Sequence, residues 1–214
     1  LAKLAHGITD DVLTATVLAR SQPLVVAPAM DADMYENPAT QANVKTLISR
    51  GVHFIGPESG RLASGLVGNG RMTEVPEIIG HVRAILGRSG DLADRQVVVS
   101  AGGTEEAIDP VRVLTNRSTG KMGYAIAEAA RDRGAKVTLI TAPTYLPIPV
   151  GVNLVAVGSA IEMQKAVRNA CLESDLLVMA AAVSDYRPSD PSDNKIKKTG
   201  DDGLSIDLSQ NPDI

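Results

Sequence analysis

The stretch from Asp109 to Gly123 carries a dense group of side chains that can bind anions. Six of its basic and polar residues fall within ten positions, namely Arg112, Asn116, Arg117, Ser118, Thr119 and Lys121. Their guanidinium, amide, hydroxyl and ammonium groups are hydrogen-bond donors that suit phosphate and carboxylate oxygens. A solvated surface loop is the alternative, but so many donors directly before an expected helix favour a binding function.

Two further groups of residues follow expected strands. Gly102, Gly103 and Thr104 come after the strand 96–100, and small residues there let backbone N–H groups approach an anion. A tight turn between strand and helix is the alternative, and the third glycine of a dinucleotide fingerprint is missing. Asp185 follows the strand 175–181 and suits a ribose or a base. Lys195 can place positive charge near a triphosphate, although for this lysine taken alone a solvated basic patch is the better explanation.

Alternating elements are expected to position these residues. Apolar or β-branched runs predict strands at 23–27, 52–55, 96–100, 136–141, 152–157 and 175–181, and helices at 38–50, 76–86, 120–133 and 160–171. Such alternation is typical of α/β proteins with a doubly wound parallel sheet, in which ligands bind beyond the carboxyl ends of the strands. We therefore predict two Rossmann-like units, both incomplete, at 1–88 and 96–214, with a linker at 89–95.

Composition excludes several classes of function. The formal net charge of −4, the pI of about 5.4 and an aromatic content of 2% argue against nucleic-acid binding. The single cysteine, Cys171, permits no internal disulfide, which fits a cytoplasmic protein. No apolar run reaches the roughly 18 residues of a membrane span, and the three histidines match no zinc spacing.

Four ordered motifs in the second half resemble one family. The strings SAGGTEEAIDPVRVLTNRSTGKMG, AAAVSDYRP, KIKK and NPDI, spread from Gln96 to Ile214, are similar to the phosphopantothenate–cysteine ligase domain of the bifunctional coenzyme A biosynthesis family. The resemblance implies that the carboxylate of 4′-phosphopantothenate attacks the α-phosphate of CTP, giving an acyl-cytidylate and pyrophosphate. The amine of cysteine then displaces CMP.

The same resemblance implies roles for individual residues. Asn116 would act on the acyl-cytidylate, Arg112 would help to hold the acidic substrate, and Lys195 would steady the phosphates. Contacts with CTP are expected from Gly102, Gly103, Thr104, Lys121, Met179, Ala180, Ala181, Asp185 and Ile214. A divalent cation, Mg²⁺ by expectation, would accompany the triphosphate.

Residues 1–88 resemble the carboxyl-terminal part of the decarboxylase of that family. The matching strings are LAKLAHGITDDVL, PAMDADMYENPATQ and GRLASGLVGNGRM. The resemblance implies an FMN-dependent flavoprotein that decarboxylates phosphopantothenoylcysteine, with a glycine-rich flap at 60–72 that closes over the substrate. Its substrate contacts would be Asp31, Met34, Asn37, Arg71 and Met72. Most flavin contacts are expected upstream of Leu1, so the chain by itself is expected to be inactive.

Two positions depart from the family pattern. Asp31 stands where relatives often carry asparagine, and Ser64 stands where they often carry the cysteine that donates a proton. An alcohol is a far weaker acid than a thiol, whose ordinary pKa is about 8.5, so serine is a poor proton donor. The unit either uses another donor, such as a protonated Asp31, or reduces its intermediate slowly, or acts as a scaffold.

Other functions remain open. A Rossmann-type NAD(P) oxidoreductase is the alternative from another class, but the missing third glycine and the lack of an acidic residue after the strand 136–141 argue against it. A non-catalytic flavoprotein is a further alternative. The resemblance also implies a homo-oligomer.

Overall fold

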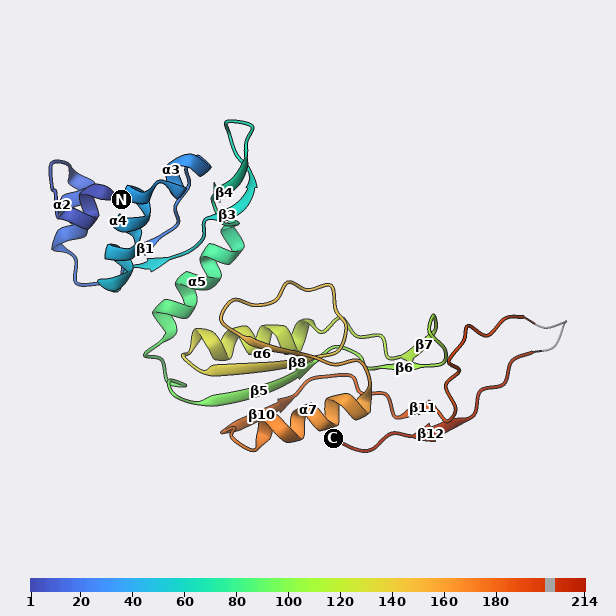
Figure 1. Cartoon of the computed structure of the whole chain (residues 1–214). Coiled ribbons are helices and arrows are strands. Elements are labelled where there is room, and N and C mark those ends of the chain that lie inside the picture. Colours follow the sequence, from blue (N-terminus) through green and yellow to red (C-terminus); the bar gives the residue numbers. More distant parts are fainter. Residues whose placement is uncertain (199–202) are drawn as a thin grey trace. The chain divides into compact units, whose positions relative to one another are not determined.

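The computed structural model describes residues 1–198 and 203–214. It divides into two compact units, Leu1–Ile85 and Leu86–Ile214, and each is described here by itself. Helices and parallel strand pairs occur in both units (Figure 1), so the predicted α/β class with parallel sheets is confirmed. No helix in the described part of the chain is long and apolar enough to cross a membrane.

The first unit is built around one short parallel strand pair. Its elements are α1 (Ala2–His6), α2 (Val12–Ala19), β1 (Val25–Val26), α3 (Ala32–Glu36), α4 (Pro38–Ser49), β2 (His53–Phe54), β3 (Glu58–Arg61), β4 (Val67–Arg71) and α5 (Val75–Gly87), whose last residues belong to the second unit. β1 pairs with β2 in parallel, and β3 and β4 form an antiparallel hairpin. Ala5, Leu47 and Val52 form its small core.

The second unit contains a four-stranded parallel sheet. Its strands β5 (Gln96–Ala101), β8 (Lys136–Thr141), β9 (Asn153–Ala156) and β10 (Leu176–Met179) lie in the order β10-β5-β8-β9. The chain starts at β5, moves outward to β8 and β9, and then returns to the other side of β5 to form β10. The direction of winding therefore reverses between β5 and β10, and in such sheets this point is where ligands bind.

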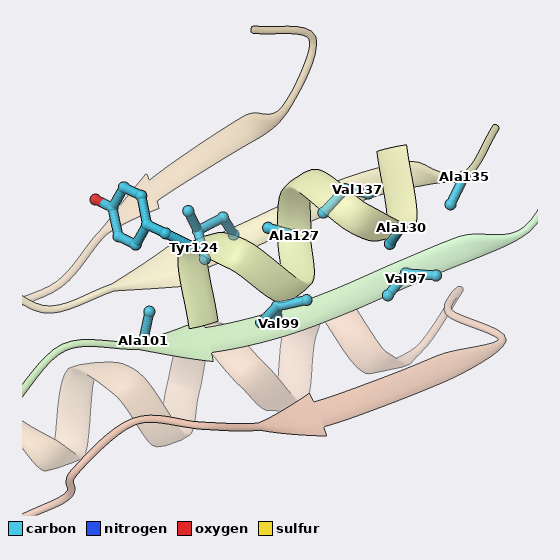
Figure 2. Packing of buried hydrophobic residues seen from close by; sticks show 9 residues of the cluster. Val97, Val99, Ala101, Tyr124, Ala127, Ala130, Ala135 and Val137 are labelled. Carbon is cyan, nitrogen blue, oxygen red and sulfur yellow. The ribbon is translucent and has the colours of Figure 1, made fainter. Parts of the chain in front are cut away.

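Two helices cover opposite faces of this sheet (Figure 1). α6 (Lys121–Asp132) packs on one face over a core of Val97, Val99, Ala101, Tyr124, Ala127, Ala130, Ala135, Val137 and Leu139 (Figure 2). α7 (Ala160–Cys171) packs on the other face over Val98, Ile140, Ala142, Met163 and Val167. Alternate residues of β5 thus point to opposite faces, as the pleat of a strand buried on both sides requires. Gly123 allows α6 to approach closely, because a Cβ atom there would lie 2.6 Å from the Cβ of Ala101.

Two antiparallel hairpins of the second unit were not predicted. β6 (Glu105–Ala107) pairs with β7 (Val113–Thr115), so part of the expected donor loop is a strand. β11 (Tyr186–Pro188) pairs with β12 (Leu208–Gln210). Both hairpins lie at the end of the unit toward which the parallel strands point (Figure 1).

Residues 89–95, predicted as a linker, lie within the second unit. The Leu92 N–H donates to the carbonyl of Arg133 at 3.0 Å, and Asp91 forms an ion pair with the side chain of Arg133. Leu92 also packs against the core beneath α6. These contacts hold the stretch against the end of α6.

Candidate functional site

The segments that follow β5 and β10 are joined at the point where the winding of the sheet reverses. The Ala182 N–H donates to the carbonyl of Gly102 at 2.7 Å, and the Thr104 N–H donates to the carbonyl of Ala182 at 3.2 Å. The buried Ser100 hydroxyl accepts hydrogen bonds from Ala180 N at 3.0 Å and from Ala181 N at 3.2 Å. Two backbone donors that were expected to face a nucleotide are therefore already bonded within the protein.

Thr104 is buried and forms hydrogen bonds within the protein. Its side chain is fully buried, and its hydroxyl accepts a hydrogen bond from Ser184 N at 3.0 Å. Its carbonyl accepts one from the Thr115 hydroxyl at 2.8 Å. This burial leaves the side chain no surface for a ligand, and the predicted contact of Thr104 with CTP stays a prediction. Thr104 instead fixes the segment that leads to Asp185.

Asn116 connects the donor-rich loop to the segment after β10. Its side-chain Nδ2 donates to the carbonyl of Val183 at 3.0 Å. The backbone is also close here, because a Cβ atom on Gly103 would lie 2.8 Å from the carbonyl oxygen of Asn116. The structure therefore places Asn116 against the segment after β10 that leads to Asp185, at one edge of the sheet.

Two cavities lie on either side of this contact. The larger, of about 450 Å³, is lined by Gly103, Glu105, Thr115, Asn116, Ser118, Thr119, Lys121, Pro143, Thr144, Tyr145 and Leu146. The smaller, of about 210 Å³, is lined by Met179, Val183, Ser184, Asp185, Gln210, Asn211, Pro212, Asp213 and Ile214. The hydrogen bond from Asn116 to Val183 links a lining residue of one cavity to a lining residue of the other.

The larger cavity is bordered by the start of α6. Gly120 precedes the helix with φ 72°, and no side chain caps this end of the helix. A Cβ atom on Gly120 would lie 2.8 Å from a methyl carbon of Thr144, so the close approach requires glycine. The N–H groups of a first helical turn carry partial positive charge and suit a phosphate or carboxylate. Lys121, in that turn, also lines the cavity.

Asn211 was not predicted, yet it fixes one wall of the smaller cavity. Its Nδ2 donates to the carbonyl of Ser184 at 2.8 Å, and its N–H donates to the carbonyl of Asp185 at 2.7 Å. The Arg187 side chain donates to the Asn211 Oδ1 at 3.0 Å. These bonds hold the segment that ends at Ile214 beside Asp185.

Arg112 and Lys195 stand apart from the cavity walls. The Arg112 guanidinium bonds to Asp109 and to the carbonyl of Ile196, the latter at 2.7 Å. Lys195 is exposed on the segment that follows β11, next to Ile196. The structure thus ties Arg112 to the segment that carries Lys195. It does not place either side chain with Asp185.

In the first unit, β4 packs against the residues around Asp31. The Met30 N–H donates to the carbonyl of Gly70 at 3.0 Å, and a Cβ atom on Gly70 would lie 2.1 Å from the carbonyl oxygen of Met30. The Asp31 Oδ1 is buried and has no hydrogen-bond partner among the described residues. Ser64 lies in the turn between β3 and β4, at the tip of the predicted flap, and is exposed.

The other residues of this unit that were predicted to contact the substrate differ in their exposure and in their bonding partners. Met34 and Met72 are exposed, at 61% and 47%. The Arg71 side chain forms an ion pair with Glu74. The Asn37 side-chain oxygen accepts a hydrogen bond from Ala39 N at 2.9 Å and so caps α4. Asn37 therefore begins the helix that the sequence predicts from about Pro38 to Arg50, and its side-chain oxygen is engaged within the protein.

No cluster of three or more histidine, cysteine, aspartate or glutamate side chains that could hold a metal ion is found among the described residues.

Two family descriptions match the chain. "Flavoprotein" matches residues 1–87, and "DNA/pantothenate metabolism flavoprotein C-terminal domain" matches residues 92–214. The chain belongs to the DNA/pantothenate metabolism flavoprotein family. The relatives that follow match the whole length of this chain and so cover both units.

Among its relatives is the coenzyme A biosynthesis bifunctional protein CoaBC of Vibrio cholerae. It is 46% identical over 215 residues, which are 100% of this chain and 54% of the relative. The protein of the same name from Bacillus subtilis is 44% identical over 217 residues, or 53% of its length. The chain spans about half the length of the curated relatives it matches. Among solved structures, the C-terminal domain of a CoaBC protein is 41% identical, with a TM-score of 0.49, over 57% of this chain and 56% of that one.

Proposed function

We propose that this chain is part of an enzyme of coenzyme A biosynthesis that joins 4′-phosphopantothenate to cysteine with CTP and then decarboxylates the product with FMN. The observation that carries the ligase proposal is the hydrogen bond from Asn116 to Val183, which links residues that line two separate cavities at the edge of the sheet where ligands of this fold bind. Relatives named as bifunctional coenzyme A biosynthesis proteins support it.

The smaller cavity suits the nucleoside. Asp185 supplies a carboxylate that can accept hydrogen bonds from ribose hydroxyls or from a base amino group, and Met179 and Ile214 supply apolar walls. Gly102 directly follows β5, Ala180 and Ala181 directly follow β10, and their backbone groups are hydrogen-bonded across these two strand ends. The nucleotide would lie across the ends of β5 and β10.

The larger cavity suits the acidic groups. The start of α6 and Lys121 offer positive charge to phosphate or carboxylate oxygens. There the substrate carboxylate would attack the α-phosphorus of CTP, forming a carbon-oxygen-phosphorus link while the bond to pyrophosphate breaks. The neutral amine of cysteine would then attack the acyl carbon, lose a proton, and release CMP.

Asn116 lines the larger cavity and bonds to Val183, which lines the smaller one, so an acyl-phosphate bond between nucleotide and substrate would lie near this amide. Its amide can donate a hydrogen bond to the acyl oxygen as negative charge develops there. Lys195 would add positive charge over the phosphates, and Mg²⁺ would bind their oxygens.

For the first unit we propose FMN-dependent decarboxylation. The buried, unpartnered Oδ1 of Asp31 fits a site that a ligand completes. Bound FMN would supply the oxidation that eases loss of CO₂ and the later reduction. Asp31, under β4, and the flap with Ser64 at its tip would enclose the substrate, and Met34, Asn37, Arg71 and Met72 would surround it. Because Ser64 is a poor proton donor, a ligase with a non-catalytic flavoprotein unit is the second candidate.

The full-length protein tests both activities at once. Incubation with CTP, 4′-phosphopantothenate and cysteine is expected to release pyrophosphate, form the amide and then release CO₂. Pyrophosphate release without CO₂ would support the second candidate. No pyrophosphate release would refute the ligase.

Asn116→Ala tests the role of this side-chain amide. The full-length variant is expected to release pyrophosphate and accumulate acyl-cytidylate, while amide formation falls by about 100-fold or more, as on removal of one donor to a developing oxyanion. Single-turnover analysis of nucleotide and acyl products measures both steps. Asn169→Ala, an exposed asparagine on α7, is the control and should change neither. Equal loss of both steps in Asn116→Ala would contradict the assignment.

A further inference from the structure

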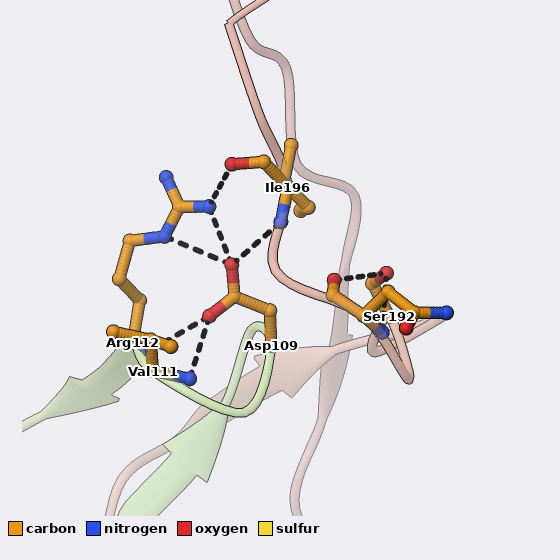
Figure 3. Close-up of polar contacts among 6 residues, drawn as sticks. Asp109, Val111, Arg112, Ser192 and Ile196 are labelled. Carbon is orange, nitrogen blue, oxygen red and sulfur yellow. Dashed lines mark hydrogen bonds and ion pairs between the residues drawn. The ribbon is translucent and has the colours of Figure 1, made fainter.

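Asp109 is a buried carboxylate with an unusually complete set of partners. Its side chain is fully buried. Oδ1 accepts hydrogen bonds from Val111 N and Arg112 N, both at 2.8 Å. Oδ2 accepts from the Arg112 guanidinium, with Nε at 2.9 Å, and from Ile196 N at 3.1 Å (Figure 3).

The same pair also binds the other backbone group of Ile196. The Arg112 guanidinium donates to the carbonyl of Ile196 at 2.7 Å, so both the N–H and the carbonyl of one residue are held (Figure 3). A second contact lies nearby, because the Ser192 N–H donates to the carbonyl of Ile108 at 3.0 Å. The turn 108–112 therefore holds the segment 192–196 at two points. We call Asp109, Arg112 and the Ile196 backbone the latch.

Separating Asp109 from its partners in the latch would cost free energy, because the carboxylate is charged and buried. The Arg112 guanidinium, followed by the N–H groups of Val111, Ile196 and Arg112, holds the pKa of Asp109 far below its ordinary value, although burial opposes this. The carboxylate is therefore ionised at neutral pH. An ionised carboxylate without its partners would be strongly unfavourable at a buried position.

The latch fixes residues on either side of Ile196. Consecutive Cα atoms are about 3.8 Å apart, so holding Ile196 also fixes where the side chains of Lys195 and Lys197 begin. Long lysine side chains are flexible, and a fixed backbone reduces the space that the ammonium group samples. Asp109 was not predicted from the sequence, and Arg112 was expected to touch substrate. The geometry instead shows both residues bonded to the backbone of Ile196.

We propose that Asp109 and Arg112 are positioning residues that hold the Ile196 backbone and so direct Lys195 toward the bound triphosphate. This inference rests on the proposed ligase function, since a triphosphate must be present. A turn that serves folding alone is the competing explanation. The exposed pair Asp91–Arg133 in the same unit provides a matched control, because its side chains are 64% and 57% exposed.

Amide hydrogen exchange tests the latch without using activity. In the full-length protein, Asp109→Asn is expected to speed exchange of the Ile196 amide by about tenfold or more, because that N–H loses its charged acceptor. Asp91→Asn should leave it unchanged. If Asp109→Asn does not fold, Arg112→Lys gives the same readout, because a lysine cannot reproduce the fork that bonds Asp109 and Ile196 together. Unchanged exchange at Ile196 would overturn the latch.

A double-mutant cycle tests whether the latch acts through Lys195. Asp109→Asn and Lys195→Ala are each expected to raise KM for CTP by about tenfold while KM for cysteine stays the same. The double variant should be no worse than Lys195→Ala alone, because a lysine that is absent cannot be misdirected. Independent effects that multiply would overturn the positioning role. A wild-type protein that releases no pyrophosphate from CTP would refute the proposed function and this role of Lys195, while the exchange measurement would still decide whether the latch holds.

Discussion

α6 and α7 are helices of 12 residues each that cover opposite faces of the same sheet, yet they begin in different ways. At the start of α7 the protein supplies its own acceptors. The Ser159 hydroxyl accepts from Glu162 N at 3.3 Å, and the Glu162 carboxylate accepts from Gly158 N at 2.6 Å. Glu106, a buried residue of β6, accepts from Ala160 N at 3.0 Å.

At the start of α6 no side chain caps the helix. Gly120 occupies the position that Ser159 holds in α7, and the hydroxyl of Ser118 reaches only Gly120 N, at 3.3 Å. A cavity of about 450 Å³ adjoins this end. At the start of α7, carboxylates of the protein accept hydrogen bonds from the N–H groups. At the start of α6, the N–H groups adjoin a cavity instead. We infer that α7 is part of the scaffold and that the start of α6 is suited to bind an anionic ligand.

The largest expected effect comes from removing the buried carboxylate at α7. Glu106→Ala should lower the free energy of unfolding by about 2–3 kcal/mol, because Ala160 N loses its acceptor and the positive end of the helix loses a buried anion. Glu106→Gln keeps an acceptor and should cost less than half as much. Urea denaturation of the full-length protein measures both. A loss below about 0.5 kcal/mol for Glu106→Ala would mean that α7 does not depend on this carboxylate.

Adding a carboxylate at α6 should affect binding instead. Ser118→Asp places a negative charge at the uncapped end, and at an effective dielectric constant near 20 a unit charge within several ångströms of a phosphate costs more than about 1 kcal/mol. KM for CTP should therefore rise by about tenfold. Thermal stability without ligand should be unchanged or slightly higher, because an anion there favours the helix.

Ser159→Asp is the matched control for that substitution. Aspartate is also a good cap, so α7 should persist, and KM for CTP should not change because this helix end is already filled by Glu162 and Glu106. If both variants raised KM equally, the difference between the two helix starts would have no bearing on the nucleotide.

The helices themselves could be read from local patterns. The range predicted for α7 matches the observed Ala160–Cys171, because Ser159 and Glu162 carry the local signal of a capping box. The strand predicted at 136–141 is also confirmed, since its β-branched and apolar run is bounded by Gly134 and Pro143. The carboxylate of Glu106 could not be assigned in this way. Its bond to Ala160 joins residues 54 positions apart, and no local pattern encodes that distance.

In the candidate site, too, contacts between residues distant in sequence could not be predicted from local patterns. Gly103 lies beside this cavity because it follows β5, whose end was predictable from the alternation of strands and helices. Lys121 does so because α6 begins there, whereas Asn116 follows β7, which alternation did not predict. The hairpins β6–β7 and β11–β12 were missed because each strand has only three residues and no alternating apolar pattern. The burial of Thr104 and the latch at Asp109 arise from contacts with Ser184 and Ile196, which are distant in sequence.

The smallest expected effect concerns the hydroxyl groups at the two helix starts. Ser159→Ala removes the cap of α7 and should lower the free energy of unfolding by about 1 kcal/mol, the usual cost of losing a serine cap. Ser118→Ala removes a bond to Gly120 N only and should cost less than about 0.5 kcal/mol, because α6 does not use that hydroxyl as its cap. Urea denaturation of the two full-length variants compares them directly. Equal losses would show that Ser118 acts as a cap in solution, and the start of α6 would then be less open to a ligand than its geometry indicates.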